Sequence, residues 1–223
     1  RSAVYRRWPY KDLFFSDLLK AIAATAPAAI GTDGTAGEDT VRQLALDRFD
    51  EFRTDEGRRA LLVELLRQGA LRDFEAMHAS TQWRTYIALH ATFLRLADGE
   101  LRTEVQGALA TAERELIDGI ARSYEQLASL LGLRLRPELN TTFGELAAQV
   151  SATMRGFVIT ARSLPDLAER QPRTGVLGVA ETAEWSQPAL GVATAALSFL
   201  EPDPGVEWDG GRLTSVRRTL EGS

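Results

Sequence analysis

Apolar side chains recur every three or four positions along most of this chain, which is the period of an amphipathic helix. The first such segment runs from Lys11 to Ala24 and stops before Pro27. No stretch alternates apolar and polar residues for long enough to predict a sheet. The pattern therefore predicts an all-α protein.

Further helices are predicted wherever the period resumes and a capping or stop residue bounds it. They cover residues 38–52, residues 54–96 as two helices broken near Gly69 or around 79–81, residues 100–131, residues 142–164 and residues 186–200. Thr54 precedes two acids and suits an N-cap. Thr142 or Thr141 caps a later helix, and Glu145 lies at capping-box distance from Thr142.

Three segments lack this period. Residues 25–40, TAPAAIGTDGTAGEDT, are small and glycine-rich and predict a flexible loop. Residues 165–185 are mixed, and TGVLGVA at 174–180 allows a short strand. The tail allows one more helical turn near 213–220.

Composition limits the class of protein. Hydrophobic residues make up 44% of the 223 positions, which is enough for a sizeable core. The chain has no cysteine, so disulfides, thiolate metal sites and thiol nucleophiles are excluded. No apolar run reaches the roughly 18 residues that a membrane span needs. The sequence therefore predicts a cytoplasmic protein with no membrane partner.

Positive charge gathers at the start of a chain whose net charge is −5. Residues 1–20 hold five basic and two acidic side chains, whereas acids outnumber bases in the rest. Basic side chains beside a helix start, here near Pro9, bind phosphate well, which suits a protein that contacts nucleic acid at one end. Alternatively, Trp8 packs on Leu13 or Phe14 as a hydrophobic staple, and the arginines are simply solvated.

The order of residues in SAVYRRWPYKDLFFSDLL, residues 2–19, resembles the end of the helix-turn-helix in the TetR family of transcriptional regulators. There the recognition helix ends in a pattern like Thr-Leu-Tyr-x-x-Phe/Trp-x-x-Lys-x-x-Leu. The matching positions here are Ala3, Val4, Tyr5, Trp8, Lys11 and Leu13 or Phe14. Tyr10 departs from the family, which usually has a small capping residue before the lysine.

The resemblance implies roles for the residues at the start of the chain. Trp8 would belong to the core of the DNA-binding domain, and the DNA-contacting residues would be Arg1, Ser2, Tyr5, Arg6 and Lys11. The chain would begin within the recognition helix, so most base-reading residues are expected before Arg1. The 223 residues alone are then expected to bind operator DNA weakly.

The same resemblance implies a fold and a function. Residues 1–24 would be a helix-turn-helix remnant with its connecting helix, residues 38–201 an effector-binding and dimerisation domain, and residues 202–223 a tail. The expected function is a ligand-responsive transcriptional regulator, a repressor released from double-stranded operator DNA by a small effector. The alternative is a helical small-molecule-binding or protein-interaction module that does not bind DNA.

Family members form homodimers through a four-helix bundle made from two late helices of each subunit. The matching helices here are 142–162 and 186–200, with Gly191, Ala195 and Ala196 allowing close approach. The implied interface residues are Phe143, Leu146, Val150, Val158, Leu190, Ala193 and Leu197. Core burial within one chain explains these apolar stripes equally well.

Aromatic and polar side chains gather in DFEAMHASTQWRTYIALHATF, residues 73–93. Apolar walls with a few polar groups are typical of small-molecule sites, so an apolar or aromatic effector is expected here. The candidate ligand-binding residues are Phe74, Met77, His78, Gln82, Trp83, Tyr86 and His90, with Tyr124, Met154 and Phe157 facing them from later helices. An ordinary protein core would give the same aromatic stripe.

No catalytic motif occurs in the chain. Glu75 and His78 have the spacing of a di-iron ligand pair, but a second pair is needed and the chain has only two histidines. The sequence therefore predicts no metal site, no cofactor and no enzymatic activity.

Overall fold

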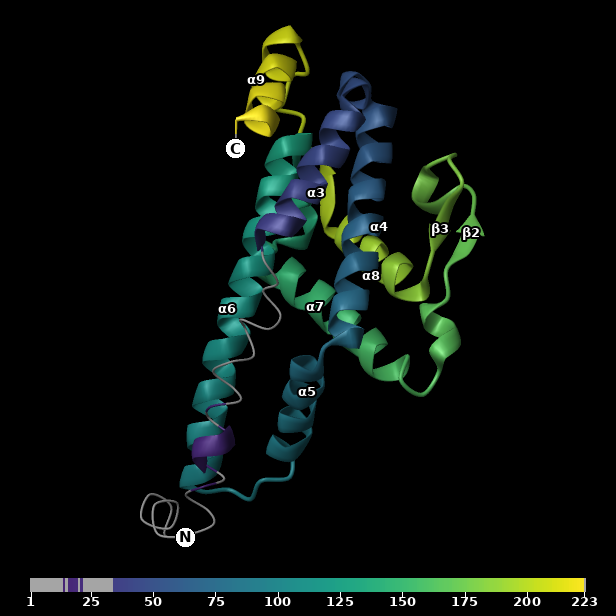
Figure 1. Cartoon of the computed structure of the whole chain (residues 1–223). Helices are drawn as coiled ribbons and strands as arrows, with labels where there is room; N and C mark the ends of the chain where they lie inside the picture. Colours follow the sequence, from purple (N-terminus) through teal and green to yellow (C-terminus); the bar gives the residue numbers. More distant parts are fainter. Residues whose placement is uncertain (1–13, 15, 20, 22–33, 223) are drawn as a thin grey trace. The chain divides into compact units, whose positions relative to one another are not determined.

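The computed structural model describes residues 14, 16–19, 21 and 34–222 (Figure 1). The described chain is mostly helical, which confirms the all-α prediction. It forms two compact units. The α5 unit contains Met77–Gly119 and the described residues before Thr32, and the α8 unit contains Asp33–Ala76 and Ile120–Ser223.

The α5 unit is built from α5, Thr81–Phe93, and the first part of α6, Glu100–Leu131. Ser80 caps α5, because its hydroxyl accepts a hydrogen bond of 3.1 Å from the backbone N–H of Trp83. A buried hydrophobic cluster in this unit is formed by Leu19, Trp83, Tyr86, Leu89, Val105 and Leu109. These positions follow the helical period on both helices, so each helix buries one apolar face.

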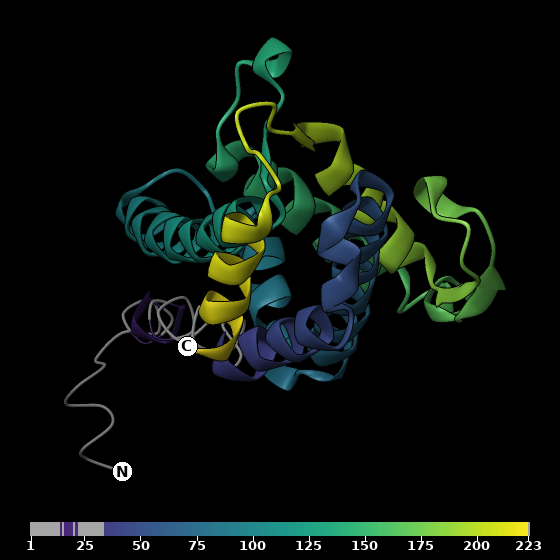
Figure 2. The same ribbon diagram turned by 90° about the horizontal axis from the view of Figure 1, so that it is seen from above.

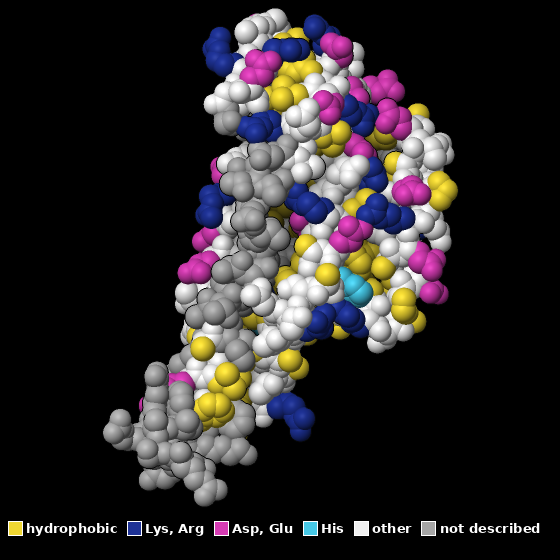
Figure 3. All heavy atoms as spheres, viewed as in Figure 1, with side chains coloured by type: hydrophobic (Ala, Val, Ile, Leu, Met, Phe, Trp, Pro, Cys, Tyr) yellow, Lys and Arg dark blue, Asp and Glu magenta, His cyan; other side chains and the backbone are white. Residues whose placement is uncertain are grey.

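The α8 unit contains the remaining helices. They are α3 Gly34–Asp47, the 3₁₀ helix η1 Phe49–Arg53, α4 Asp55–Ala79, the last part of α6, η2 Pro137–Leu139, α7 Phe143–Thr160, η3 Pro165–Ala168, η4 Val176–Gly178, α8 Gln187–Phe199 and α9 Gly210–Glu221. Helices α7 and α8 pack against each other, and α9 lies beside α3 and η1 (Figure 2). Arg217 of α9 lies over the ring of Phe49 at 4.1 Å from its centroid. On the face in Figure 3, acidic and basic side chains are interspersed.

Helices α7 and α8 approach closely at a glycine. A Cβ atom on Gly191 of α8 would lie 2.6 Å from Cε2 of Phe157 on α7. Real Cβ atoms do not come so close, so only glycine leaves room for this aromatic ring. Gly191 therefore allows close approach of α7 and α8 within one chain, and its role in a contact between two subunits stays a prediction.

Within the described residues, four short strands form two antiparallel pairs. Strand β1, Leu133–Leu135, pairs with β4, Leu200–Pro202, with Leu133 opposite Pro202. Strand β2, Gln171–Arg173, pairs with β3, Ala183–Trp185, with Gln171 opposite Trp185 (Figure 1). The prediction of no sheet was wrong at these four places, since strands of three residues are too short to show an alternating pattern.

The predicted capping residues are confirmed. Thr54 accepts a 3.0 Å hydrogen bond from the N–H of Gly57 at the start of α4. Thr142, rather than Thr141, caps α7, and its capping box with Glu145 is complete. The break expected in 54–96 lies at Ser80, whereas Gly69 lies inside α4.

Other predicted elements need correction. Helix α3 begins at Gly34, so the loop predicted over 25–40 was wrong from that residue onward, and 25–33 lies outside the described residues. Helix α7 ends at Thr160, because the proline at 165 disfavours helical backbone in the residue before it and the chain leaves the helix as turns. Residues 174–180 hold η4 rather than a strand. The tail forms the whole helix α9 instead of one turn.

Candidate functional site

Three aromatic side chains lie on one face of α5. Trp83, Tyr86 and His90 are separated by three and four residues, which places them on successive turns of the same face. The rings of Trp83 and Tyr86 meet edge to face at 5.7 Å between centroids, and those of Tyr86 and His90 do so at 4.6 Å. We call these three side chains the aromatic ladder of α5.

Helix α6 brings a carboxylate to the middle of this ladder. The hydroxyl of Tyr86 donates a hydrogen bond of 2.5 Å to Oε1 of Glu113. The Nε2 atom of His90 lies 3.3 Å from the same oxygen. Hydrogen bonds to an ionised acceptor are among the stronger ones, so this contact fixes the position of the tyrosine.

The ladder passes from the core towards the surface. Trp83 and Tyr86 are each 2% exposed, whereas the side chain of His90 is 36% exposed and that of Glu113 is 26% exposed. Apolar side chains of α5, α6 and the adjoining segments surround the ladder, among them Met77, Ile87, Phe93, Leu101 and Val105. The arrangement is a mainly apolar environment with few polar groups, which is the usual composition of a small-molecule site.

Two ring nitrogens of the ladder are buried without a hydrogen-bond partner among the described residues. They are Nε1 of Trp83 and Nε2 of His90. Buried polar atoms are hydrogen-bonded in nearly all folded proteins, and an exception calls for an explanation. A bound molecule with acceptor atoms would satisfy the indole N–H.

The end of α5 is held by a cation from α6. Arg102 donates hydrogen bonds to the carbonyl oxygens of Leu96, at 2.6 Å, and Phe93, at 3.3 Å. Its guanidinium lies 4.8 Å from the centroid of the Phe93 ring. A positive charge at the end of a helix complements the dipole there, so Arg102 positions the helix that carries the ladder.

The predicted ligand-binding residues divide between the two units. Met77, His78, Gln82, Trp83, Tyr86 and His90 belong to the α5 unit, whereas Phe74, Tyr124, Met154 and Phe157 belong to the α8 unit. Within the first set, Gln82 is exposed and Met77 and His78 are partly buried. Within the second set, Phe74 and Met154 are buried, and Phe157 packs on Gly191. Burial raises the pKa of Tyr124, and the nearby Asp73 carboxylate adds to this shift.

Sequence reasoning missed Glu113 and Arg102. Glu113 follows the apolar stripe of α6, four residues after the buried Leu109 and three before the buried Leu116. A charged residue within an apolar stripe was the available signal. Its partner could not be read from the chain, since Tyr86 is 27 residues away.

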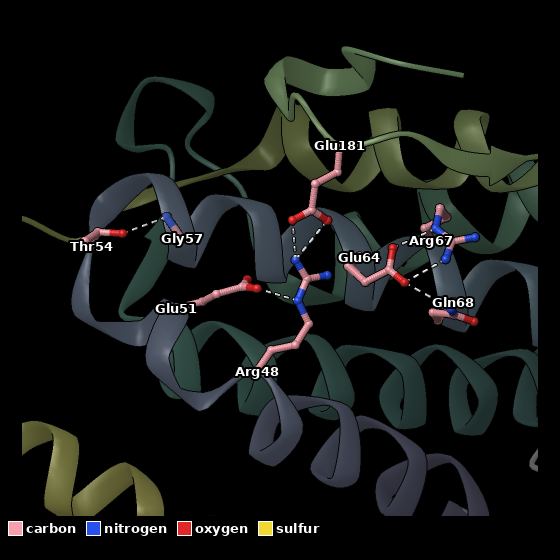
Figure 4. A network of polar contacts seen from close by, with 8 residues as sticks. All are labelled: Arg48, Glu51, Thr54, Gly57, Glu64, Arg67, Gln68 and Glu181. Carbon is pink, nitrogen blue, oxygen red and sulfur yellow. Dashed lines mark hydrogen bonds and ion pairs between the residues drawn. The ribbon is translucent and has the colours of Figure 1, made fainter. Parts of the chain in front are cut away.

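A second polar cluster lies on α4 in the α8 unit (Figure 4). Arg67 donates to both carboxylate oxygens of Glu64, at 2.6 and 2.7 Å, and to the backbone oxygen of Glu184, at 2.8 Å. Arg48 donates to both oxygens of Glu181, at 3.0 and 3.1 Å, and to Glu51 at 2.5 Å. These contacts join η1 and α4 to the segment around β3, so the cluster stabilises the fold.

Burial by itself would raise the pKa of Glu64, but the hydrogen bonds from Arg67 and Gln68 outweigh it, and the pKa is lowered. The carboxylate therefore stays ionised inside this cluster. Its charge is satisfied by protein groups, and it is not available for chemistry with a ligand.

A surface hollow of about 350 Å³ lies where η1 meets α9, lined by residues 46–51 and Arg217. The arginines that line it already have partners, since Arg48 contacts Glu51 and Glu181, and Arg217 contacts Glu221 and the ring of Phe49. In the described part of the chain, no cluster of three or more His, Asp or Glu side chains could hold a metal ion. Glu75, of the Glu-x-x-His spacing, pairs with Arg170.

The residues predicted to form a dimer interface lie on α7 and α8. Leu146, Val150, Val158 and Ala193 are buried within one chain, and Phe143, Leu190 and Leu197 are partly buried. Core packing within one chain therefore accounts for much of the apolar stripe on α7 and α8, which was the alternative to a dimer interface. The predicted DNA-contacting residues Arg1, Ser2, Tyr5, Arg6 and Lys11 lie outside the described residues.

Within the described residues, none of the helices combines the length and apolar character that crossing a membrane requires. The chain was also compared with protein-family models, with curated proteins and with solved structures, and none of them matches it.

Proposed function

We propose that this protein is a ligand-responsive, DNA-binding transcriptional regulator of the TetR type. The observation that carries the proposal is the order of Tyr5, Trp8 and Lys11 ahead of a long all-α body. The aromatic ladder of α5 supports it, because two buried ring nitrogens without partners suit a site for a small effector. Phosphate contacts are assigned to the basic residues at the start of the chain, because residues 1–20 hold five basic and only two acidic side chains.

In the proposed mechanism, binding of the effector changes the spacing of the two DNA-binding domains of a homodimer. Paired recognition helices of a homodimer would read two half-sites about 34–36 Å apart. An effector that binds better to one conformation of the body shifts the population towards it. Release follows where the favoured conformation no longer fits both half-sites at once.

The proposed homodimer contact uses the outward face of α7. Val150 is only 7% exposed and is committed to the core of its own chain. Ala148, Ala152, Gly156 and Ile159 are exposed and lie on a common face of α7. Gly156 has open space beside it, and Ile159 is 51% exposed, so this face offers close approach and one apolar anchor.

The regulatory function is tested with protein expressed from its complete gene. DNA fragments are selected from a random library, and the enriched sequence is titrated in mobility-shift assays over a range of salt concentrations. A paired, two-fold-related motif with affinity that falls steeply with salt is expected, because phosphate contacts release counterions. Lys11→Ala is expected to reduce the salt slope by about 1. Lys20→Ala, which changes the only other lysine in the chain, is the matched control.

Failure to enrich any sequence would contradict the DNA-binding function and favour the helical binding module. Equal salt slopes for Lys11→Ala and Lys20→Ala would contradict the role assigned to Lys11. Release of the selected DNA by small molecules extracted with the protein, and identified by mass spectrometry, would support an effector.

The dimer contact is tested by sedimentation velocity on the 223-residue chain. Ile159→Asp places a charge on the proposed interface and is expected to give monomers without loss of helix content. Leu94→Asp, at a leucine that is 77% exposed on the α5 unit, is the control and is expected to leave a dimer. A dimer that survives Ile159→Asp unchanged would rule out this face.

A further inference from the structure

The aromatic ladder of α5 carries hydrogen-bonding nitrogens at both of its ends. Trp83 and His90 are seven residues apart on the same helical face, which corresponds to about 10.5 Å along the helix axis. Tyr86 lies between them and contacts both rings edge to face, at 5.7 and 4.6 Å between centroids. The three rings therefore form a row about as long as a fused aromatic molecule, buried at Trp83 and Tyr86 and partly exposed at His90.

Tyr86 of the ladder has a hydrogen-bond partner, whereas the ring nitrogens of Trp83 and His90 have none among the described residues. The hydroxyl of Tyr86 is engaged with Glu113 at 2.5 Å. Trp83 is 2% exposed, yet its indole N–H has no acceptor among the described residues, and Nε2 of His90 is likewise buried without a hydrogen bond there. An indole N–H can only donate, so the group missing from Trp83 is an acceptor.

The same type of partner suits His90. Its Nε2 atom lies 3.3 Å from Oε1 of Glu113 without making a hydrogen bond to it, and Nε2 carries the proton in one of the two neutral tautomers of histidine. With that tautomer the histidine is also a donor. Both ends of the ladder therefore suit acceptor oxygens.

The charge of the ligand follows from its surroundings. The ladder is packed among Met77, Ile87, Phe93 and Leu101, and Trp83 has almost no contact with solvent. Moving an ionised group into such an environment costs far more than moving a neutral carbonyl that receives a hydrogen bond. A neutral oxygen acceptor is therefore favoured over a carboxylate.

We propose that the α5 unit binds a flat, neutral aromatic ketone or quinone, whose carbonyl oxygen accepts a hydrogen bond from the indole N–H of Trp83. The rings of the ligand lie along the ladder, and a second oxygen, where the ligand has one, accepts from Nε2 of His90. The assignment of this molecule as the effector rests on the proposed regulatory function, whereas its binding to the α5 unit can be measured independently.

The test compares two probes of nearly the same shape. 9-Fluorenone carries a carbonyl oxygen, and fluorene has a CH₂ group in its place. Each is titrated into the ¹⁵N-labelled 223-residue chain, which has four tryptophans and therefore few indole cross-peaks in a ¹H–¹⁵N spectrum. The Trp83 cross-peak is the one that disappears in Trp83→Phe. Should that variant fail to fold, Trp8→Phe, Trp185→Phe and Trp208→Phe identify it by elimination.

Fluorenone is expected to move the indole proton of Trp83 downfield and to leave the peaks of Trp185 and Trp208 in place. Fluorene is expected to bind about ten-fold more weakly, which is the loss of one hydrogen bond. Trp83→Phe is expected to bring the two affinities together, whereas the control Trp208→Phe keeps the difference. Equal affinity of the wild-type chain for both probes, or an unmoved Trp83 peak, would overturn the proposal.

The outcomes separate this site from the regulatory function. A Trp83 shift with fluorenone in a protein that selects no DNA supports the binding site and contradicts the regulator. Selective DNA binding without a preference for fluorenone contradicts the site and leaves the regulator standing.

Discussion

The contact between α7 and α8 at Gly191 gives the sharpest test of the packing. Gly191→Ala places a Cβ atom 2.6 Å from Cε2 and 3.1 Å from Cζ of Phe157, and 3.5 Å from Cγ2 of Thr153. The first two distances are shorter than van der Waals contact allows, so the phenylalanine ring or the helix must move. Overpacking of this kind costs about 1–3 kcal/mol.

A second effect acts in the opposite direction. Alanine is about 1 kcal/mol more favourable than glycine inside a helix, whatever its neighbours. Gly69→Ala isolates this gain, because Gly69 lies within α4 and a Cβ atom there would have no neighbour within 4 Å. We therefore expect Gly69→Ala to stabilise the chain by about 1 kcal/mol. We expect Gly191→Ala to be about 1–3 kcal/mol less stable than Gly69→Ala.

Urea denaturation followed by far-UV circular dichroism measures both free energies of unfolding. In thermal melts the same difference corresponds to about 2–4 °C per kcal/mol for a chain of this size. A double-mutant cycle with Phe157→Leu adds a second check, since a smaller side chain should relieve the clash and make the two changes non-additive. Equal stability of Gly191→Ala and Gly69→Ala, or strict additivity in the cycle, would refute the reasoning.

Three further predictions concern polar groups. Arg67→Met leaves the partly buried carboxylate of Glu64 without its cation and is expected to cost roughly 3 kcal/mol in urea denaturation, whereas simultaneous Glu64→Gln should recover part of this loss. Folding lowers the pKa of Glu64, so the stability that its ionised form contributes is complete above the ordinary carboxyl pKa of 4.5 and is lost as the pH falls through the lower folded pKa. The free energy of unfolding of the wild type should therefore decrease more than that of Glu64→Gln between about pH 5 and pH 3. Thr142→Ala removes the cap of α7 and is expected to cost about 1 kcal/mol, and Thr141→Ala, which leaves the cap in place, should cost less.

Local signals in the sequence predicted the ends of several helices. Thr142 with Glu145 is one example, because a capping box depends only on residues three positions apart and works in the same way in any protein. Helix α6 was predicted with the bounds it has, since a glycine precedes it and Gly132, with φ of 62°, ends it. Helix α3 was predicted to begin too late, because the small residues before position 38 have no periodic pattern and its packing beside α9 was not visible.

The candidate site was predicted in part. The spacing of Trp83, Tyr86 and His90 places them on one face of a helix, and that follows from sequence alone. Glu113 was not predicted, because no local rule links it to a tyrosine 27 residues earlier. Tyr124 and Met154 were grouped with the ladder on their chemistry, but they belong to the α8 unit.

The sequence by itself determined where most helices lie and which of their faces are apolar, because period and capping are properties of a few adjacent residues. The tertiary structure decided what each apolar face packs against. On α7, Leu146 and Val150 are buried within their own chain, while Ile159 remains exposed, although all three are similar apolar side chains. Strands β1 and β4 exist only because the ends of α6 and α8 meet and their backbone groups pair. Such pairings join residues far apart in the chain, so they depend on the packing of whole helices.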